Sequence, residues 1–248
     1  MDFAVVIPAR YGATRLPGKP LADVCGRPMI QWVYEAAAAG GAAEVIVATD
    51  DARIAEACDR FGARAEMTDS AHASGTDRIA EVARRLDWPD EQVVVNVQGD
   101  EPLLPPVLVS QVAELLDGVP EAGMATLATP ILDRAEWDDP NVVKVVTDRR
   151  SRALYFSRAR IPWPRDGTGP AVNAMRHVGL YGYRVWALKA FTGAGPCGLE
   201  LQERLEQLRA LWLGISIHVA QAHEAPPRGV DTEEDLQAVR RILLQRPG

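Results

Sequence analysis

The stretch that decides the fold is Phe3-Ala4-Val5-Val6-Ile7-Pro8-Ala9-Arg10-Tyr11-Gly12-Ala13-Thr14-Arg15-Leu16-Pro17-Gly18-Lys19-Pro20. The short apolar run over Phe3–Pro8 predicts a buried strand, and the loop after it carries two arginines, a lysine and two glycines. Because ligands of open α/β sheets bind beyond the carboxyl ends of the strands, this loop is placed to hold a triphosphate. It is not a Walker A loop, since its glycines are too far apart and Pro20 replaces the required Ser or Thr. The alternative is a solvated loop whose charges only favour solubility.

Working outward, strand-like runs alternate with helical patterns through the first half of the chain. Apolar runs at 44–49 and 92–98 alternate with helical spacing at 29–40, 75–86 and 105–116, and a short strand is expected at 64–67. This alternation predicts an α/β fold with a doubly wound, mainly parallel sheet.

The middle of the chain has a different character. Antiparallel strands are predicted at 142–147, 153–156 and 177–183, a Pro- and Gly-rich loop at 162–175, a helix at 199–213 and a strand at 216–220. A last helix is predicted from Asp231 to about Leu244. We therefore expect one domain over residues 1–248, in which residues about 142–215 form a small mixed α+β lobe that is used in dimerisation.

Composition excludes several classes of protein. With 27 basic against 34 acidic residues and a net charge of -7, the chain lacks the basic footprint of a nucleic-acid-binding protein. Its three cysteines (Cys25, Cys58 and Cys197) form no C-x-x-C pair, which argues against disulfides or zinc and favours a reducing compartment. No signal peptide and no long apolar run are present, so we expect a cytoplasmic protein without a membrane segment.

The second polar segment, Asn96-Val97-Gln98-Gly99-Asp100-Glu101-Pro102, follows the strand predicted at 92–98. A carboxylate at this edge of the sheet is suited to bind hydrated Mg²⁺, so Asp100 is a candidate metal ligand. The alternative is an aspartate in a tight turn that Gly99 and Pro102 favour, and the motif alone does not decide between the two.

Two further segments carry weaker signals. Ser74-Gly75-Thr76-Asp77-Arg78 predicts a helix start, capped by Ser74 or Thr76, and such a cap is compatible with ligand binding. Gly229-Val230-Asp231-Thr232 presents Asp231 either as a distant metal ligand or as an N-cap, and composition alone favours the cap. The four histidines lack zinc-pair spacing, and His218 is expected at the surface because it alternates with apolar residues.

Taken in order, the segments resemble one family across nearly the whole chain. The resemblance is to 3-deoxy-manno-octulosonate (Kdo) cytidylyltransferases, also called CMP-Kdo synthetases, and it rests on 7–20, 48–50, 72–78, 96–102, 155–159, 176–183, 205–209 and 229–232. It implies a nucleotide-diphospho-sugar transferase-like fold, a homodimer, and an Mg²⁺-dependent coupling of CTP to Kdo. The products are pyrophosphate and CMP-Kdo, which is used in lipopolysaccharide biosynthesis.

The resemblance also implies roles for individual residues. CTP would be bound by Pro8, Ala9, Arg10, Lys19, Ser74, Gly75, Arg78 and Gln98. The sugar would be contacted by Arg15, Gln98, Arg158, His177, Tyr181, Glu206 and Gln207. Lys19, Arg15 and Asp100 would be catalytic, and Asp100 and Asp231 would bind Mg²⁺.

Three alternatives remain open at this point. A cytidylyltransferase for sialic acid or for 8-amino-Kdo would share the fold and the reaction type. A non-catalytic regulator that binds sugar nucleotides would have no need for Lys19, Asp100 and Asp231, all of which are present.

Overall fold

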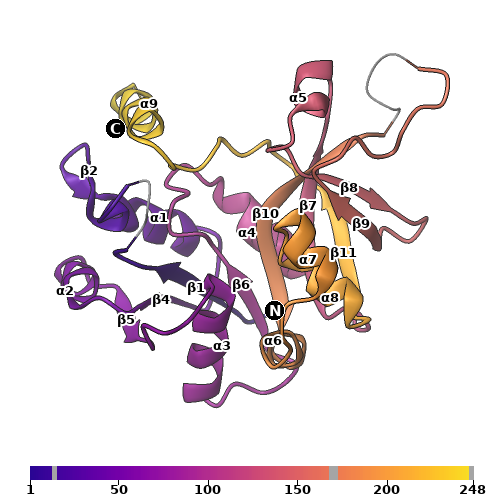
Figure 1. The fold of residues 1–248 in the computed structure, drawn as a ribbon. Coiled ribbons are helices and arrows are strands. Elements are labelled where there is room, and N and C mark those ends of the chain that lie inside the picture. The colour runs from indigo at the N-terminus through magenta and orange to yellow at the C-terminus, as the bar shows by residue number, and fades with distance from the viewer. Residues whose placement is uncertain (13–15, 168–172, 246–248) are drawn as a thin grey trace.

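The computed structural model describes residues 1–12, 16–167 and 173–245. Its central sheet has the strand order β11-β7-β10-β6-β1-β4-β5, and β8 and β9 extend it beside β10 (Figure 1). The strands are β1 (Phe3–Ala9), β4 (Glu44–Thr49), β5 (Arg64–Met67), β6 (Val93–Asn96), β7 (Met124–Pro130), β8 (Lys144–Thr147), β9 (Ala153–Ser157), β10 (Met175–Arg184) and β11 (Ile217–Gln221). β10 runs antiparallel to β6 and β7, whereas β1 is parallel to β4 and β6. The predicted doubly wound, mainly parallel sheet is confirmed.

Two layers of helices cover the two faces of this sheet. Alternate residues of β1 point to opposite sides, so Val5 and Ile7 join one apolar core while Val6 joins the other. The first core is completed by α1 (Met29–Ala38), α2 (Ala52–Arg60) and α4 (Pro106–Asp117), and the second by α3 (Gly75–Arg85) and α6 (Val185–Thr192). The predicted helices at 29–40, 75–86 and 105–116 are confirmed.

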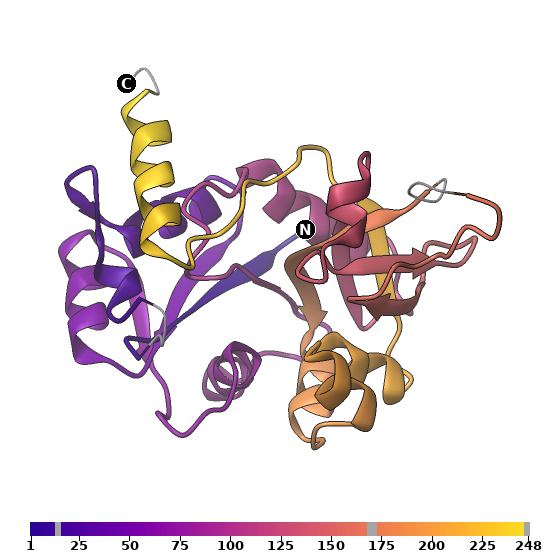
Figure 2. The same ribbon diagram turned by 45° about the horizontal axis from the view of Figure 1, so that its top comes forward.

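The lobe combines β8, β9 and the outer part of β10 with a group of short helices (Figure 2). The helix predicted at 199–213 is wrong, because the chain forms α7 (Gly198–Glu203) and α8 (Gln207–Trp212) instead. Arg204 separates the two helices in the left-handed conformation, with φ 56° and ψ 47°. Another short helix, α5 (Arg134–Asp138), precedes β8, and part of the loop predicted at 162–175 lies outside the described residues.

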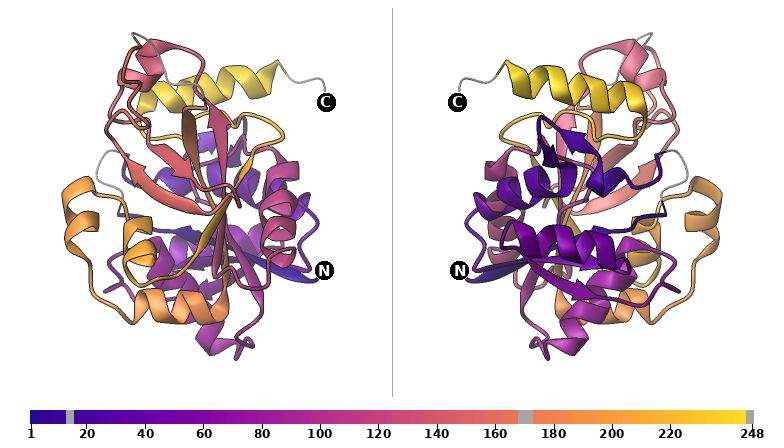
Figure 3. Two further views of the ribbon diagram at one scale, coloured as in Figure 1. Left: turned by 90° about the vertical axis from the view of Figure 1, so that its right-hand side faces the viewer. Right: turned by 90° about the vertical axis from the view of Figure 1, so that its left-hand side faces the viewer.

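The end of the chain returns to its beginning. α9 (Glu233–Leu244) packs against the hairpin of β2 (Asp23–Val24) and β3 (Arg27–Pro28) (Figure 3). Leu236 and Val239 of this helix share a small core with Val24 and Met29. The segment that enters α9 therefore crosses the carboxyl edge of the sheet. No helix in the described part of the chain has the length and apolar character needed to cross a membrane.

Candidate active site

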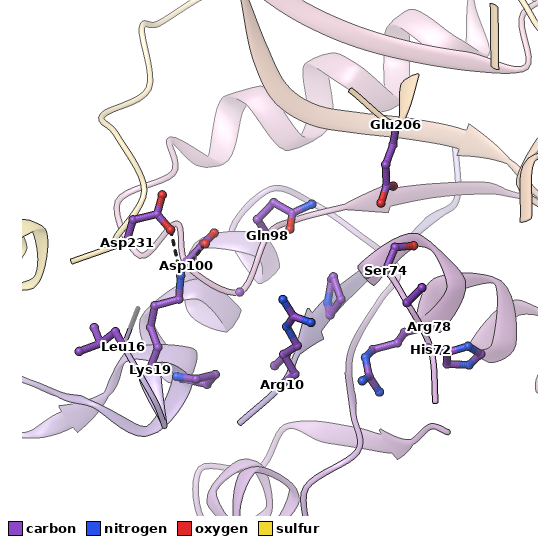
Figure 4. A pocket seen from close by; sticks show the side chains of 16 residues that line it. Arg10, Leu16, Lys19, His72, Ser74, Arg78, Gln98, Asp100, Glu206 and Asp231 are labelled. Carbon is purple, nitrogen blue, oxygen red and sulfur yellow. Dashed lines mark hydrogen bonds and ion pairs between the residues drawn. The ribbon is translucent and has the colours of Figure 1, made fainter. Parts of the chain in front are cut away.

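A cavity of about 470 Å³ opens between the loops that follow β1 and β6 (Figure 4). The chain passes from β1 outward to β4 and β5 and then returns to β6 on the other side of β1. The loops after β1 and β6 therefore diverge, which leaves a crevice at the point where open α/β sheets bind their ligands.

The floor of the cavity depends on two glycines that approach Pro8. A Cβ at Gly99 would lie 2.8 Å from the Pro8 carbonyl oxygen, and a Cβ at Gly75 would lie 3.0 Å from Pro8 Cγ. The distance at Gly99 is too short for a Cβ, so the loop after β6 can close on β1 only because glycine stands there, whereas a Cβ at Gly75 would make a tight contact with the Pro8 ring.

One ammonium group joins the two carboxylates that were predicted to bind metal. Lys19 begins η1 (Lys19–Leu21), directly after Gly18 at φ 70°. Its Nζ donates to Asp100 Oδ2 at 2.8 Å and to the Val230 carbonyl at 2.7 Å, and it lies 3.5 Å from Asp231 Oδ1. The loops after β1 and β6 and the segment before α9 thus meet at a single cation.

The start of α9 fixes the position of Asp231. Thr232 is the N-cap of this helix, so the reading of Asp231 as the cap is wrong. The Asp235 carboxylate accepts the backbone N–H groups of Asp231 at 3.0 Å and Thr232 at 2.9 Å, and the Val230 N–H donates to the Asp100 carbonyl at 2.8 Å. A helix cap and one backbone hydrogen bond therefore hold the second carboxylate beside the first.

Glu101 directly follows Asp100 in the chain, and no role was predicted for it. Burial, and next the charge of Asp100, raise the pKa of the Glu101 carboxyl to about 8. The side chain is thus mainly uncharged at neutral pH, which leaves the negative charge at this corner on Asp100 and Asp231.

The opposite wall is formed by the start of α3. Ser74 caps the helix in a reciprocal capping box with Asp77, and it also lines the cavity, so capping and lining coexist as expected. The guanidinium of Arg78 is buried and donates to Asp50 at 2.7 Å and to Thr68 Oγ1 at 2.8 Å. Arg78 therefore ties the loop after β4 to this wall.

His72 also lines the cavity, and the sequence did not predict a role for it (Figure 4). Its Nε2 lies 2.6 Å from Glu81 Oε2, and the same oxygen accepts the Asp69 N–H at 2.9 Å. Burial acts to raise the pKa of Glu81, but the hydrogen bonds from the Asp69 N–H and from His72 lower it overall. No spacing in the sequence signals this pair, because the two residues meet only after α3 packs under the preceding loop.

The residues predicted to contact the sugar divide into two groups. Glu206 lines the cavity and accepts the Thr76 hydroxyl at 3.1 Å, and burial raises the pKa of its carboxyl. His177 and Tyr181 lie behind it on β10, with ring centroids 5.2 Å apart. These two rings, like Arg158 and Gln207, are not part of the cavity lining.

Arg158 is engaged in the lobe. Its Nε donates to the Glu203 carbonyl at 2.7 Å and its NH1 to the Pro140 carbonyl at 3.0 Å. Arg15 lies outside the described residues. The predicted residues that the structure brings together around the cavity are Pro8, Ala9, Arg10, Lys19, Ser74, Gly75, Arg78, Gln98, Asp100, Glu206 and Asp231.

One prediction outside the cavity is wrong. His218 was expected at the surface, yet it is 5% exposed because the β8–β9 ribbon covers β11 through a bridge between Arg152 and His218.

Comparisons with known proteins point to one family. The sequence model of the family described as "Cytidylyltransferase" matches residues 4–217. The 3-deoxy-manno-octulosonate cytidylyltransferase of Pseudomonas syringae pv. syringae (strain B728a) is 56% identical over 97% of this chain and 98% of its own. The protein of the same name from Vibrio cholerae serotype O1 (strain M66-2) is 55% identical over 99% of both chains.

Solved structures extend the comparison. A structure of CMP:2-keto-3-deoxy-manno-octonic acid synthetase complexed with CTP superposes with a TM-score of 0.91 and 43% identity, and the match covers 99% of both chains. A cytidylyltransferase from Leptospira borgpetersenii, with a TM-score of 0.64 and 14% identity, shares the fold. The chain belongs to the cytidylyltransferase family, in the group of 3-deoxy-manno-octulosonate cytidylyltransferases.

Proposed function

We propose that the protein couples CTP to Kdo, giving CMP-Kdo and pyrophosphate for lipopolysaccharide assembly, and that this cavity is its active site. The observation that carries the proposal is the meeting of Lys19, Asp100 and Asp231 at the sheet's switch point. The names of the relatives and the CTP complex of the related structure support the choice of substrates.

The nucleotide would lie between the two walls of the cavity. Arg10, exposed at the end of β1, and Lys19 supply positive charge for the triphosphate, whose anionic oxygens suit charge-assisted hydrogen bonds. Gly75 and Ser74 at the start of α3 offer a narrow wall against Pro8, which suits a planar base. Gln98 would mark the boundary between the nucleotide and the sugar.

The residues present fit a magnesium ion. Asp100 and Asp231 already share one cation, the Lys19 ammonium. The described residues contain no group of three or more side chains that could hold a metal, so these two carboxylates would be the protein's ligands. Mg²⁺ commonly binds through one or two carboxylates and completes its shell with water and substrate phosphates. When bound, it would offset the phosphate charge and favour loss of the proton from the attacking hydroxyl.

The reaction would proceed by in-line displacement. The 2-hydroxyl oxygen of the sugar forms a bond to the α-phosphorus while the bond from that phosphorus to the β-phosphate oxygen breaks, and pyrophosphate leaves with the electron pair. Lys19, which is held beside Asp100, would bind the phosphates. Most of the rate enhancement would then come from positioning the reactants and from neutralising their charge. Glu206, which lines the cavity, would bind the sugar. On binding, the sugar would also have to reach the residues that the family resemblance assigns to it outside the lining, which are His177, Tyr181, Gln207, Arg158 and Arg15.

A sugar panel tests this proposal. Pyrophosphate release would be measured with CTP, Mg²⁺ and either Kdo, 8-amino-Kdo or sialic acid, for wild type, Asp100→Asn and the control Asp117→Asn, at an exposed position that ends α4. We expect release with Kdo, a loss of at least about a hundredfold in Asp100→Asn, and no loss in the control. Preference for another sugar would replace Kdo as the substrate. Silence with every sugar despite CTP binding would favour the regulator.

A further inference from the structure

The strand that carries His177 and Tyr181 is interrupted by a bulge of two extra residues. β10 pairs with β7 so that Val178 faces Leu127 and Tyr181 faces Thr126. Neighbouring residues on β7 are thus matched by residues three apart on β10, which leaves Gly179 and Leu180 without partners on β7.

The bulge brings two distant side chains together. In a regular strand, residues four apart are separated by about 13 Å. The rings of His177 and Tyr181 have centroids only 5.2 Å apart, and Phe156 meets His177 edge-on at 5.0 Å. The paired rings that the proposed function assigns to the sugar therefore exist only because β10 is bent at this point.

Thr126 binds the inner side of the bulge. It is fully buried on β7, and its Oγ1 lies 2.9 Å from the Val178 carbonyl, 2.8 Å from the Leu180 carbonyl and 3.0 Å from His177 Nε2. One hydroxyl thus contacts the carbonyls on both sides of Gly179 and the imidazole beside them.

Counting hydrogens fixes the roles of these groups. A threonine hydroxyl has one hydrogen and accepts through its lone pairs, whereas a carbonyl oxygen can only accept. The single hydrogen must point toward the two carbonyls, because two unshielded oxygens would otherwise repel the hydroxyl at these distances. The lone pair that remains then faces Nε2, and this contact is a hydrogen bond only in the tautomer that carries hydrogen on Nε2.

We propose that Thr126 is a positioning residue that closes the β10 bulge and sets His177 in the tautomer with hydrogen on Nε2, so that Nδ1 accepts a hydrogen bond from a hydroxyl of the acidic sugar. This inference rests on the proposed function for its substrate, but its account of the tautomer does not.

The surroundings of the two rings support this role. The buried Tyr181 hydroxyl lacks a hydrogen-bond partner among the described residues, and the contact of His177 with Thr126 uses Nε2 and not Nδ1. Burial lowers the pKa of His177 to about 3, which keeps one ring nitrogen an acceptor at neutral pH. An acceptor and a hydroxyl beside each other match a polyhydroxylated ligand, whose hydroxyl groups both donate and accept.

Nitrogen NMR of protein labelled with ¹⁵N in histidine reads the tautomer without substrate. The chain has four histidines, and the His177 signal is identified by its loss in His177→Asn. We expect a neutral ring with hydrogen on Nε2 in wild type and in Thr126→Ser, and a mixture of the two tautomers in Thr126→Val. Hydrogen on Nδ1 in wild type, or an unchanged signal in Thr126→Val, would overturn the proposal.

Kinetics with the same variants reads the positioning. We expect Thr126→Val to raise KM for Kdo about five- to tenfold with KM for CTP unchanged, and Thr126→Ser to recover most of the loss. Thr129→Val is the matched control, since this buried threonine of β7 accepts Arg176 instead and should leave KM for Kdo unchanged. Equal effects on both substrates, or no recovery with serine, would overturn positioning. If wild type itself made no CMP-Kdo, the proposed function would fail while the NMR result would still stand.

Discussion

His177 shows how the fold controls the charge of a single residue. Burial lowers its pKa to about 3 from an ordinary value of 6.5. Between these two pH values the ring stays neutral in the folded protein but is protonated in the unfolded chain. Stability from this group is fully present above pH 6.5 and is lost as the pH falls toward 3.

The free energy of unfolding should fall with pH because of His177. Between pH 7 and pH 5 this one residue should remove about 2 kcal/mol of stability, a loss that His177→Gln should not show. Urea unfolding of both proteins at the two pH values measures the difference, and His223→Gln, at an exposed position, controls for the substitution itself. Parallel losses in wild type and His177→Gln would contradict the expected neutral ring.

At the scale of elements, the capping box of α9 does two things at once. The Asp235 carboxylate accepts the N–H of the N-cap residue Thr232 and, through the Asp231 N–H, orients the second proposed metal ligand. The hydrogen bond from the Asp231 N–H is the main cause that lowers the pKa of Asp235, which keeps the carboxylate charged for both tasks.

Asp235→Ala should therefore change stability and magnesium dependence together. We expect a loss of about 1 kcal/mol in the free energy of unfolding and a several-fold higher Mg²⁺ concentration for half-maximal rate. Asp133→Ala removes a comparable cap from α5 and should lower stability without changing the Mg²⁺ requirement. A shift of equal size in both variants would show that the cap of α9 does not act on Asp231.

Which elements could be predicted depends on the range of the interactions that form them. Apolar runs between polar turns predicted β1, β4 and β6, and the parallel topology then placed Lys19 and Asp100 at one edge of the sheet. The break at Arg204 was missed because no Gly, Pro or Asn marks it. β7 was missed as well, and with it the contact of Thr126 with the bulge.

The same distinction holds for the candidate site. Loops that leave neighbouring strands can be read from local pattern, whereas for Asp231 the local pattern favoured an N-cap and only the family resemblance favoured a metal ligand. The pairs His72–Glu81 and Thr126–His177 depend on packing between separate elements, and no local pattern in the sequence indicates such contacts.

At the scale of the whole molecule, the lobe exposes large apolar side chains. Leu154 on the edge strand β9 is 60% exposed, and Trp163 and Trp212 are exposed by 65% and 67%. Large apolar side chains exposed on one lobe are common at interfaces between proteins, and we propose that this lobe forms the interface of a homodimer.

Sedimentation tests that proposal directly. Wild type should sediment at twice the chain mass of 27.0 kDa, and Leu154→Glu should shift it toward the monomer by burying an unpaired charge. Leu244→Glu, at a position 75% exposed on α9 outside the lobe, should remain dimeric. A monomeric wild type at micromolar concentration, or a dimer that Leu154→Glu leaves intact, would contradict the role of this lobe.

Nucleotidyl transfer at the α-phosphorus of CTP can be followed by ³¹P NMR of a mixture of protein, CTP, Kdo and Mg²⁺. We expect the three phosphorus signals of CTP to be replaced by one phosphodiester signal of CMP-Kdo and by pyrophosphate, in equal amounts and only when the sugar is present. Formation of CDP with inorganic phosphate, or of CMP with pyrophosphate whether or not the sugar is added, would contradict it.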